Sequence, residues 1–215
     1  MSVKLPNGAL IYLATGYDAA DTISAVTNAS PAVVSSTGHG LSNLDPFELT
    51  SGWSRVNDRV FRAAGVATNA LNIDGLDTTD TTVFPAGTGT GSLRKINAWT
   101  QMQQVTDLQT SGGDQQFTTY EFLENDFQTQ LPTVVSPMTL TLTFADDVAL
   151  PGQIAIASAA EARAKRALKM VMPGGGYIYM NGYVSFNPVP RMTKGQIMSV
   201  VGTFSLASLP VRYAS

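Results

Sequence analysis

One stretch of this chain, from Met138 to Phe144, alternates strictly between large apolar residues and threonine. Successive side chains of a β-strand point to opposite faces, so a period of two separates the two kinds of residue. The apolar side chains would face a core. The threonines Thr139, Thr141 and Thr143 would form a polar face on the other side. The segment is therefore predicted to be a half-buried strand.

Looser versions of the same pattern recur four times, and each is bounded by Gly, Pro, Asn or Asp. They span residues 9–17, 116–123, 177–186 and 197–206. β-branched and aromatic residues, which favour pleated and half-buried strands, are common in them. The chain is therefore predicted to be mainly β.

One segment departs from this pattern. Ser158-Ala-Ala-Glu161 has the form of a capping box, in which the serine and glutamate side chains satisfy free amides at a helix start. Alanine-rich sequence with apolar residues at helical spacing follows it, and Pro173 ends it. We therefore predict one amphipathic helix at about residues 158–171. Its exposed face would carry the cations Arg163, Lys165, Arg166 and Lys169.

Residues 20–93 consist of short apolar runs separated by turn sequences. A Gly/Thr-rich stretch at 84–92 closes this region and has the composition of a linker. We predict an inserted small β-rich module at 20–93, within one β domain formed by residues 1–19 and 94–215. A single β domain with one long excursion is the alternative.

Charged residues are scarce, at 13% of the chain against about 25% in typical soluble domains. Residues 1–150 hold 6 Lys and Arg against 15 Asp and Glu, a net charge of −9, whereas residues 151–215 hold 7 against 1, a net charge of +6. The two parts either neutralise each other within one fold or pair between copies of the chain. A sequence pI near 5.0 with scattered basic residues argues against specific nucleic-acid binding.

The sequence also limits the available chemistry and location. It contains no cysteine, and therefore no disulfide or thiolate metal site. Its start lacks the apolar core of a signal peptide, and no run approaches the ~20 apolar residues of a membrane span. We therefore expect no membrane insertion by this chain.

No catalytic, cofactor-binding or metal site emerges from the motifs. The only histidine, His39, lies between two glycines and is expected to shape a turn. The glycines at 87–92 lack the Walker spacing, and the acidic run at 74–80 lacks the order of a calcium loop. Five acidic residues could supply a glycosidase pair, although no spacing selects two of them: Glu121, Glu124, Asp126, Asp146 and Asp147.

Three stretches resemble the major tail tube proteins of long-tailed, non-contractile bacteriophages and related prophages. They are SGGDQQFTTYEFLENDFQTQLPT with the SPMTLTLTFADD that follows it, PGQIAIASAAEARAKRALKMVMPGGGYIYMNGYVSFNPVP, and the module sequence from Val26 to Thr82. The last is similar to a small β module that recurs in phage tail and baseplate proteins. The glycine-histidine-glycine turn and the Asn-Asp-Arg-Val-Phe segment are its most characteristic parts.

The resemblance implies a β-sandwich or split β-barrel flanked by one helix, with the module on the outer surface. It implies a structural virion protein, assembled in the bacterial cytoplasm, that forms hexameric rings stacked head to tail around a DNA conduit. Its partners would be its own copies, the tape measure protein, tail terminator and tip proteins, and DNA in transit without specific binding. Under this interpretation the four basic residues are candidates for ring stacking and the three threonines for a lumenal or solvated face. No cofactor is implied.

Two other function classes remain open. A carbohydrate-binding or adhesion protein of two β domains would use an aromatic platform that includes Trp53, Trp99, Tyr177, Tyr179 and Tyr183. A hydrolase would use the acidic residues around Glu121 to Asp126.

Overall fold

The computed structural model describes residues 7–214 and is mainly β with one helix, as predicted. Residues 1–6 and 215 of the predicted β domain therefore lie outside the described part. The strands of the first half are β1 (Leu10–Tyr17), β2 (Asp21–Ile23), β3 (Ala25–Val26), β4 (Val33–Ser35), β5 (Pro46–Ser51), β6 (Arg59–Ala67), β7 (Ala70–Ile73) and β8 (Gly91–Met102). The second half holds β9 (Val105–Ser111), β10 (Gln115–Tyr120), β11 (Thr129–Val135), β12 (Thr139–Ala145), α1 (Pro151–Ala162), β13 (Lys165–Val171), β14 (Tyr177–Arg191), β15 (Ser199–Leu206) and β16 (Val211–Tyr213).

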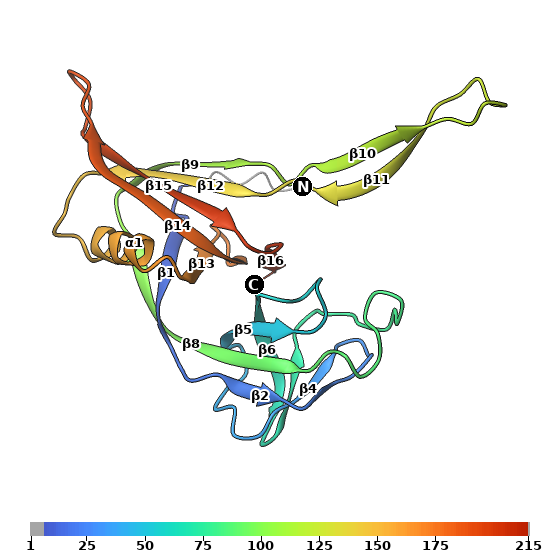
Figure 1. The fold of residues 1–215 in the computed structure, drawn as a ribbon. Helices are drawn as coiled ribbons and strands as arrows, with labels where there is room; N and C mark the ends of the chain where they lie inside the picture. The colour runs from blue at the N-terminus through green and yellow to red at the C-terminus, as the bar shows by residue number, and fades with distance from the viewer. Residues whose placement is uncertain (1–6, 215) are drawn as a thin grey trace.

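Fourteen of these strands form one hydrogen-bonded network that curls strongly (Figure 1). Its path runs β3-β4-β7-β6-β5-β8-β1-β13-β14-β15-β12-β9, with β16 paired to β14 and β2 paired to β8. β10 and β11 form a separate two-stranded sheet. The long strand β8 pairs with β5 through its first half and with β1 through its second, so it joins the two ends of the molecule.

The main core lies between α1 and the concave face of the sheet around β12, β15 and β14. Leu140, Leu142 and Phe144 are buried there, which confirms the predicted inward face of the alternating segment. Ile156 of α1 packs over Gly202 of β15, and a Cβ added to Gly202 would stand 2.5 Å from the Ile156 Cδ1. A residue without a side chain is therefore what allows the helix to approach the sheet this closely.

The predicted helix at 158–171 is wrong in its position. The helix begins at Pro151, because proline suits the first helical position, and it ends before Arg163, which has a left-handed φ of 49°. Residues 165–171 form β13 instead, hydrogen-bonded to β1 on one side and β14 on the other. Pairing on both edges outweighs the helical propensity of the segment.

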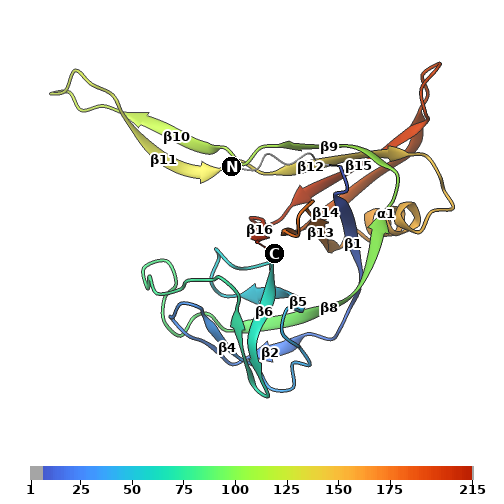
Figure 2. The ribbon, with the colours of Figure 1, turned by 180° about the vertical axis from the view of Figure 1, so that it is seen from behind.

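Residues 23–93 contribute a second core, built around Phe47, Phe61 and Trp53. The Gly/Thr-rich stretch at 84–92, predicted to be a linker, is packed into it. Gly89 lies beneath the Trp53 ring, where an added Cβ would stand 2.8 Å from Cζ2, and Ser51 Oγ donates to the Gly89 carbonyl at 3.0 Å. In Figures 1 and 2 this part lies on the opposite side of the molecule from β9 and β12.

Candidate assembly surfaces

The convex side of the sheet carries one continuous polar surface. Residues opposite one another on neighbouring strands share a face, so the register of β9, β12, β15 and β14 defines its members. We call the resulting set the polar sheet face, and its three rows are Ser111-Thr139-Ser205-Tyr183, Gln109-Thr141-Thr203-Ser185 and Asp107-Thr143-Val201-Asn187.

Hydroxyl and amide groups dominate the polar sheet face. Asp107 is the only member with a charge at neutral pH. The three threonines are half-buried because their neighbours stand beside them on the pleat. The structure therefore places Thr139, Thr141 and Thr143 within a hydroxyl-rich surface, whose first row continues past Tyr183 to Lys165 of β13. Such a surface hydrogen-bonds water, and the one lysine at its edge is paired with Asp58.

The four basic candidates do not share one exposed face. Lys165 Nζ lies 2.7 Å from Asp58 Oδ2, and this hydrogen bond raises the pKa of the lysine. The Lys169 ammonium lies 4.7 Å from the centre of the Tyr12 ring and 4.8 Å from that of Trp99, and its burial lowers its pKa. Two of the four cations are therefore engaged within the chain.

The other two differ in exposure. Arg166 is half-buried on the opposite face of β13 from Lys165, with its guanidinium carbon 5.7 Å from the Tyr17 ring centre. Arg163 follows the helix and is exposed. Of the four candidates, Arg163 is the one that presents its charge to solvent most fully.

Three of the five platform aromatics line one cleft. Trp99, Tyr177 and Tyr179 share a cleft of about 580 Å³ with Lys169 and Arg62. Burial raises the pKa of Tyr179 to about 12. Trp53 lies elsewhere, buried in the second core, where its indole N–H donates to the Pro85 carbonyl at 2.9 Å. Tyr183 lies on the polar sheet face. The platform is therefore divided among three places.

His39 shapes a turn, as predicted. It is buried, and its Nδ1 accepts the Leu41 amide at 3.2 Å, which leaves Nε2 to donate to the Ala67 carbonyl at 3.0 Å. Its neighbours Gly38 and Gly40 both have left-handed φ angles, of 74° and 58°. Both ring nitrogens are therefore occupied by the backbone.

The acidic candidates are dispersed. Glu121, Glu124 and Asp126 lie at the exposed end of the β10–β11 hairpin, while Asp146 accepts from Gln153 of α1 and Asp147 accepts the Ala149 amide. Asp77 and Asp80 accept from Thr79 and Thr82, and these hydrogen bonds lower both pKa values. Within residues 7–214 no group of three or more His, Asp or Glu side chains is placed to hold a metal ion.

Two features were missed in the sequence. One is the exposed β10–β11 hairpin, of which only a strand was predicted. Its signal is a run of aromatic and acidic residues without a single cation. The other is a buried polar junction between β14 and the first half of the chain, centred on Asn181 and Glu48. A lone Asn within an apolar strand was its only trace in the sequence.

A comparison with protein families matches residues 51–215 to the phage tail tube protein family. A search of curated proteins found no match. Among residues 7–214, no helix is long and apolar enough to cross a membrane. The family match covers most of the chain, including the whole polar sheet face, and the mainly β fold with one helix agrees with it. The chain therefore belongs to the phage tail tube protein family and is a structural protein of the phage tail.

Proposed function

We propose that this chain forms closed hexameric rings that stack head to tail, and that the polar sheet face lines the lumen through which DNA leaves the virion. The observation that carries this proposal is the composition of that face: twelve positions in three rows with one charge, the carboxylate of Asp107. Lys and Arg side chains bind DNA by displacing the cations condensed on its phosphates. A face without them lets the polymer slide.

The predicted division of the chain fits this arrangement. Residues 20–93 would form an outer module, and residues 1–19 with 94–215 the tube-forming domain. The core around Phe47 and Phe61 supports a separate unit, and it lies away from β9 and β12 (Figure 2). A bulky unit on the lumenal side would obstruct the conduit, so the module belongs outside.

The other partners expected of a tail tube protein fit the same arrangement. The tape measure protein would occupy the lumen before DNA does, and terminator and tip proteins would close the two ends of the tube. Assembly would take place in the cytoplasm of the host bacterium. Ring stacking would use the exposed Arg163. Lys165, Arg166 and Lys169 would instead stabilise the folded subunit through contacts within the chain.

A labelling experiment tests the lumenal face. The chain has no cysteine, so Thr141→Cys and Thr203→Cys each create a unique thiol. In assembled tubes, we expect these thiols to react with a small maleimide but not with a maleimide on a polymer too large to enter the lumen. Ser54→Cys, at an exposed position of the module, should react with both. Equal reaction of all three with the large reagent would place the polar sheet face outside.

A second candidate function is carbohydrate binding. It is favoured by the cleft that gathers Trp99, Tyr177 and Tyr179, since sugar rings stack on aromatic side chains. A glycan array with purified protein tests it, with Trp99→Ala as the variant. Loss of a bound glycan in Trp99→Ala would support the function, and an array without any bound glycan would contradict it.

A further inference from the structure

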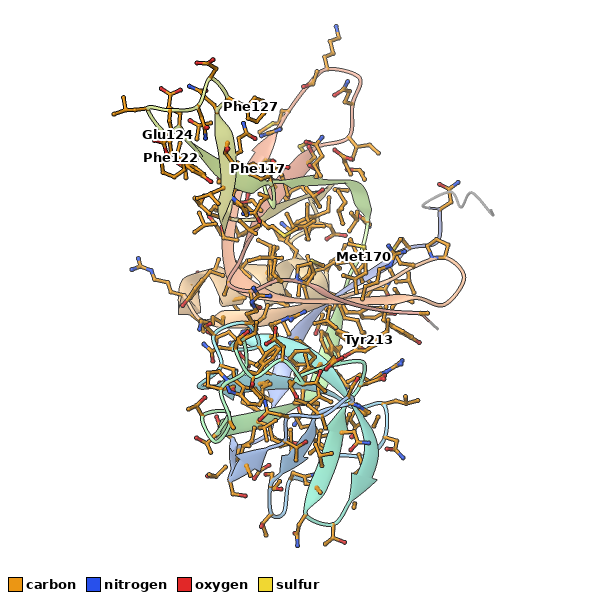
Figure 3. All side chains as sticks on the ribbon, turned by 90° about the vertical axis from the view of Figure 1, so that its right-hand side faces the viewer. Phe117, Phe122, Glu124, Phe127, Met170 and Tyr213 are labelled. Atoms are coloured by element: carbon orange, nitrogen blue, oxygen red, sulfur yellow. The ribbon has the colours of Figure 1, made fainter. Side chains whose placement is uncertain are left out.

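The β10–β11 hairpin is exposed along its whole length. Every residue from 115 to 135 is exposed, and its two strands pair only with each other (Figure 3). We call residues 115–135 the acidic arm, because they contain Glu121, Glu124 and Asp126 and no Lys or Arg. An isolated two-stranded hairpin is marginally stable in water, so this arm needs a partner to hold its shape.

Large apolar side chains cover the acidic arm. Near its tip, Phe122 and Phe127 are 56% and 79% exposed, and Leu123 is fully exposed. Phe117, Leu131 and Val134 are exposed on its strands, with Phe117 and Leu131 on opposite faces of the hairpin. Exposed apolar side chains gathered in this way, densest at the tip, are typical of a protein contact. The contact would have to tolerate or attract three carboxylates.

A second projecting hairpin has the opposite charge. Residues 187–198 comprise the last part of β14 and the loop that leads to β15, and they contain Arg191 and Lys194 without any Asp or Glu, so we call them the basic arm. They are exposed apart from the half-buried Pro190. Their exposed apolar side chains are Val189, Met192, Ile197 and Met198. Methionine adapts its shape and packs well against aromatic rings.

The two arms point to opposite sides of the molecule in Figures 1 and 2. They therefore do not meet within one chain, whereas the acidic arm of one copy can meet the basic arm of another. Contact between two different surfaces of identical chains is heterologous and generates rings or filaments. This is the kind of contact that a tube requires.

We propose that the acidic arm of each copy packs against the basic arm of a neighbouring copy. Phe122 and Phe127 would contact Met192 and Ile197, and Glu121 and Glu124 would pair with Arg191 and Lys194. The proposal rests on the self-assembly proposed above and names the surfaces that carry it. Desolvated aromatic contacts would provide most of the affinity, and the charges would select the partner and its orientation.

An alternative seat for the aromatic tip is the cleft of about 690 Å³ between β1, β8 and β9, which is lined by Ile11, Met102 and Met170. Within residues 7–214, Asp107 is its only charged lining residue. Three carboxylates of the acidic arm would be repelled there rather than attracted. Charge complementarity therefore favours the basic arm.

Charge reversal tests the pairing. Glu121→Lys/Glu124→Lys makes both arms basic, and Arg191→Glu/Lys194→Glu makes both arms acidic. We expect each variant alone to remain folded by circular dichroism and to lose tubes in negative-stain electron microscopy, at concentrations where the wild type forms them. An equimolar mixture should form tubes again, because alternating copies then pair opposite charges. Alternation requires an even number of copies per ring, which six satisfies.

Matched controls change the same net charge elsewhere. Asp18→Lys/Glu161→Lys and Arg55→Glu/Arg212→Glu alter exposed residues outside both arms and should assemble like the wild type. Tubes from either arm variant alone, or a mixture that stays unassembled, would overturn the pairing of the arms. Those results would leave tube formation by the wild type intact. A wild type without rings or tubes at any concentration would instead overturn the proposed function, and the arm pairing with it.

Discussion

The Asn181 side chain reaches across the molecule to Glu48, to which its Nδ2 donates a hydrogen bond of 2.8 Å over a separation of 133 residues. The same Nδ2 donates to the Asp58 carbonyl at 2.9 Å, and Arg94 pairs with the other oxygen of Glu48. Ser208 Oγ also donates to the Asp58 carbonyl, at 2.8 Å. β14 and the β5–β6 region are therefore joined through a buried polar network rather than through a flexible link.

We expect Asn181→Ala to lower the free energy of unfolding by about 2–3 kcal/mol, since it removes a buried hydrogen bond to a charged group and leaves the Asp58 carbonyl with one partner fewer. Urea denaturation measures the change. Ser185→Ala, at an exposed position of the same strand, serves as the control and should cost little. Equal effects of the two substitutions would show that the network adds nothing.

Gly202→Ala should destabilise the chain by about 1–3 kcal/mol, because the new Cβ would stand 2.5 Å from Ile156 Cδ1. Ile156→Val removes that methyl group and costs about 1 kcal/mol in the wild type. In the Gly202→Ala background it should restore part of the lost stability. Thermal unfolding of the four proteins gives the coupling, and strictly additive effects would contradict the close helix–sheet contact.

Stability should fall as the pH rises above 10. Burial raises the pKa of Tyr179 from 10.0 to about 12, so the unfolded chain loses this proton first. The stability that this raised pKa contributes is fully present below pH 10, and it is lost as the pH approaches 12. Over this pH range we expect the unfolding free energy of Tyr179→Phe to fall by about 2 kcal/mol less than that of the wild type. Urea midpoints between pH 9 and pH 11.5 test it, and a wild-type slope in Tyr179→Phe would contradict it.

His39→Ala should lower stability by about 1–3 kcal/mol, because it leaves the buried Leu41 amide and the Ala67 carbonyl without their side-chain partner. Tubes should still form once the protein is folded. A loss of tubes with unchanged stability would instead place His39 in a contact between subunits.

Arg163→Glu is the cleanest test of the stacking role of the basic residues. Arg163 is exposed and has no ion-pair partner among residues 7–214, so its reversal should leave the unfolding transition unchanged. We expect shorter tubes or separate rings in negative-stain images. Lys165→Glu, by contrast, should lower stability, because it sets a carboxylate against Asp58. Wild-type tube length in Arg163→Glu would exclude a role in stacking.

Short-range sequence patterns determined much of the secondary structure of this protein. The alternation at 138–144 placed Leu140, Leu142 and Phe144 inside, and the segments at 9–17, 177–186 and 197–206 are strands at those places. A period of two is imposed by the pleat itself and needs no knowledge of the partner strand. The glycines around His39 likewise indicated its turn, because φ angles above zero suit glycine. The segments at 138–144 and 177–186 and the turn around His39 also lie in the stretches that carried the resemblance to the tail tube family.

Other features were decided only by the tertiary structure. Residues 165–171 have helical propensity, yet the free edges of β1 and β14 selected the strand. Trp53 and Trp99 have equal hydropathy, yet one is buried in a core and the other lines a cleft. The cation-free run at 115–135 and the lone Asn181 were visible in the sequence, but neither showed that the hairpin stands clear of the rest or that Glu48 meets Asn181. Burial and long-range pairing are properties of the whole folded chain, so the sequence determined the strands and the tertiary structure decided which surfaces are left for assembly.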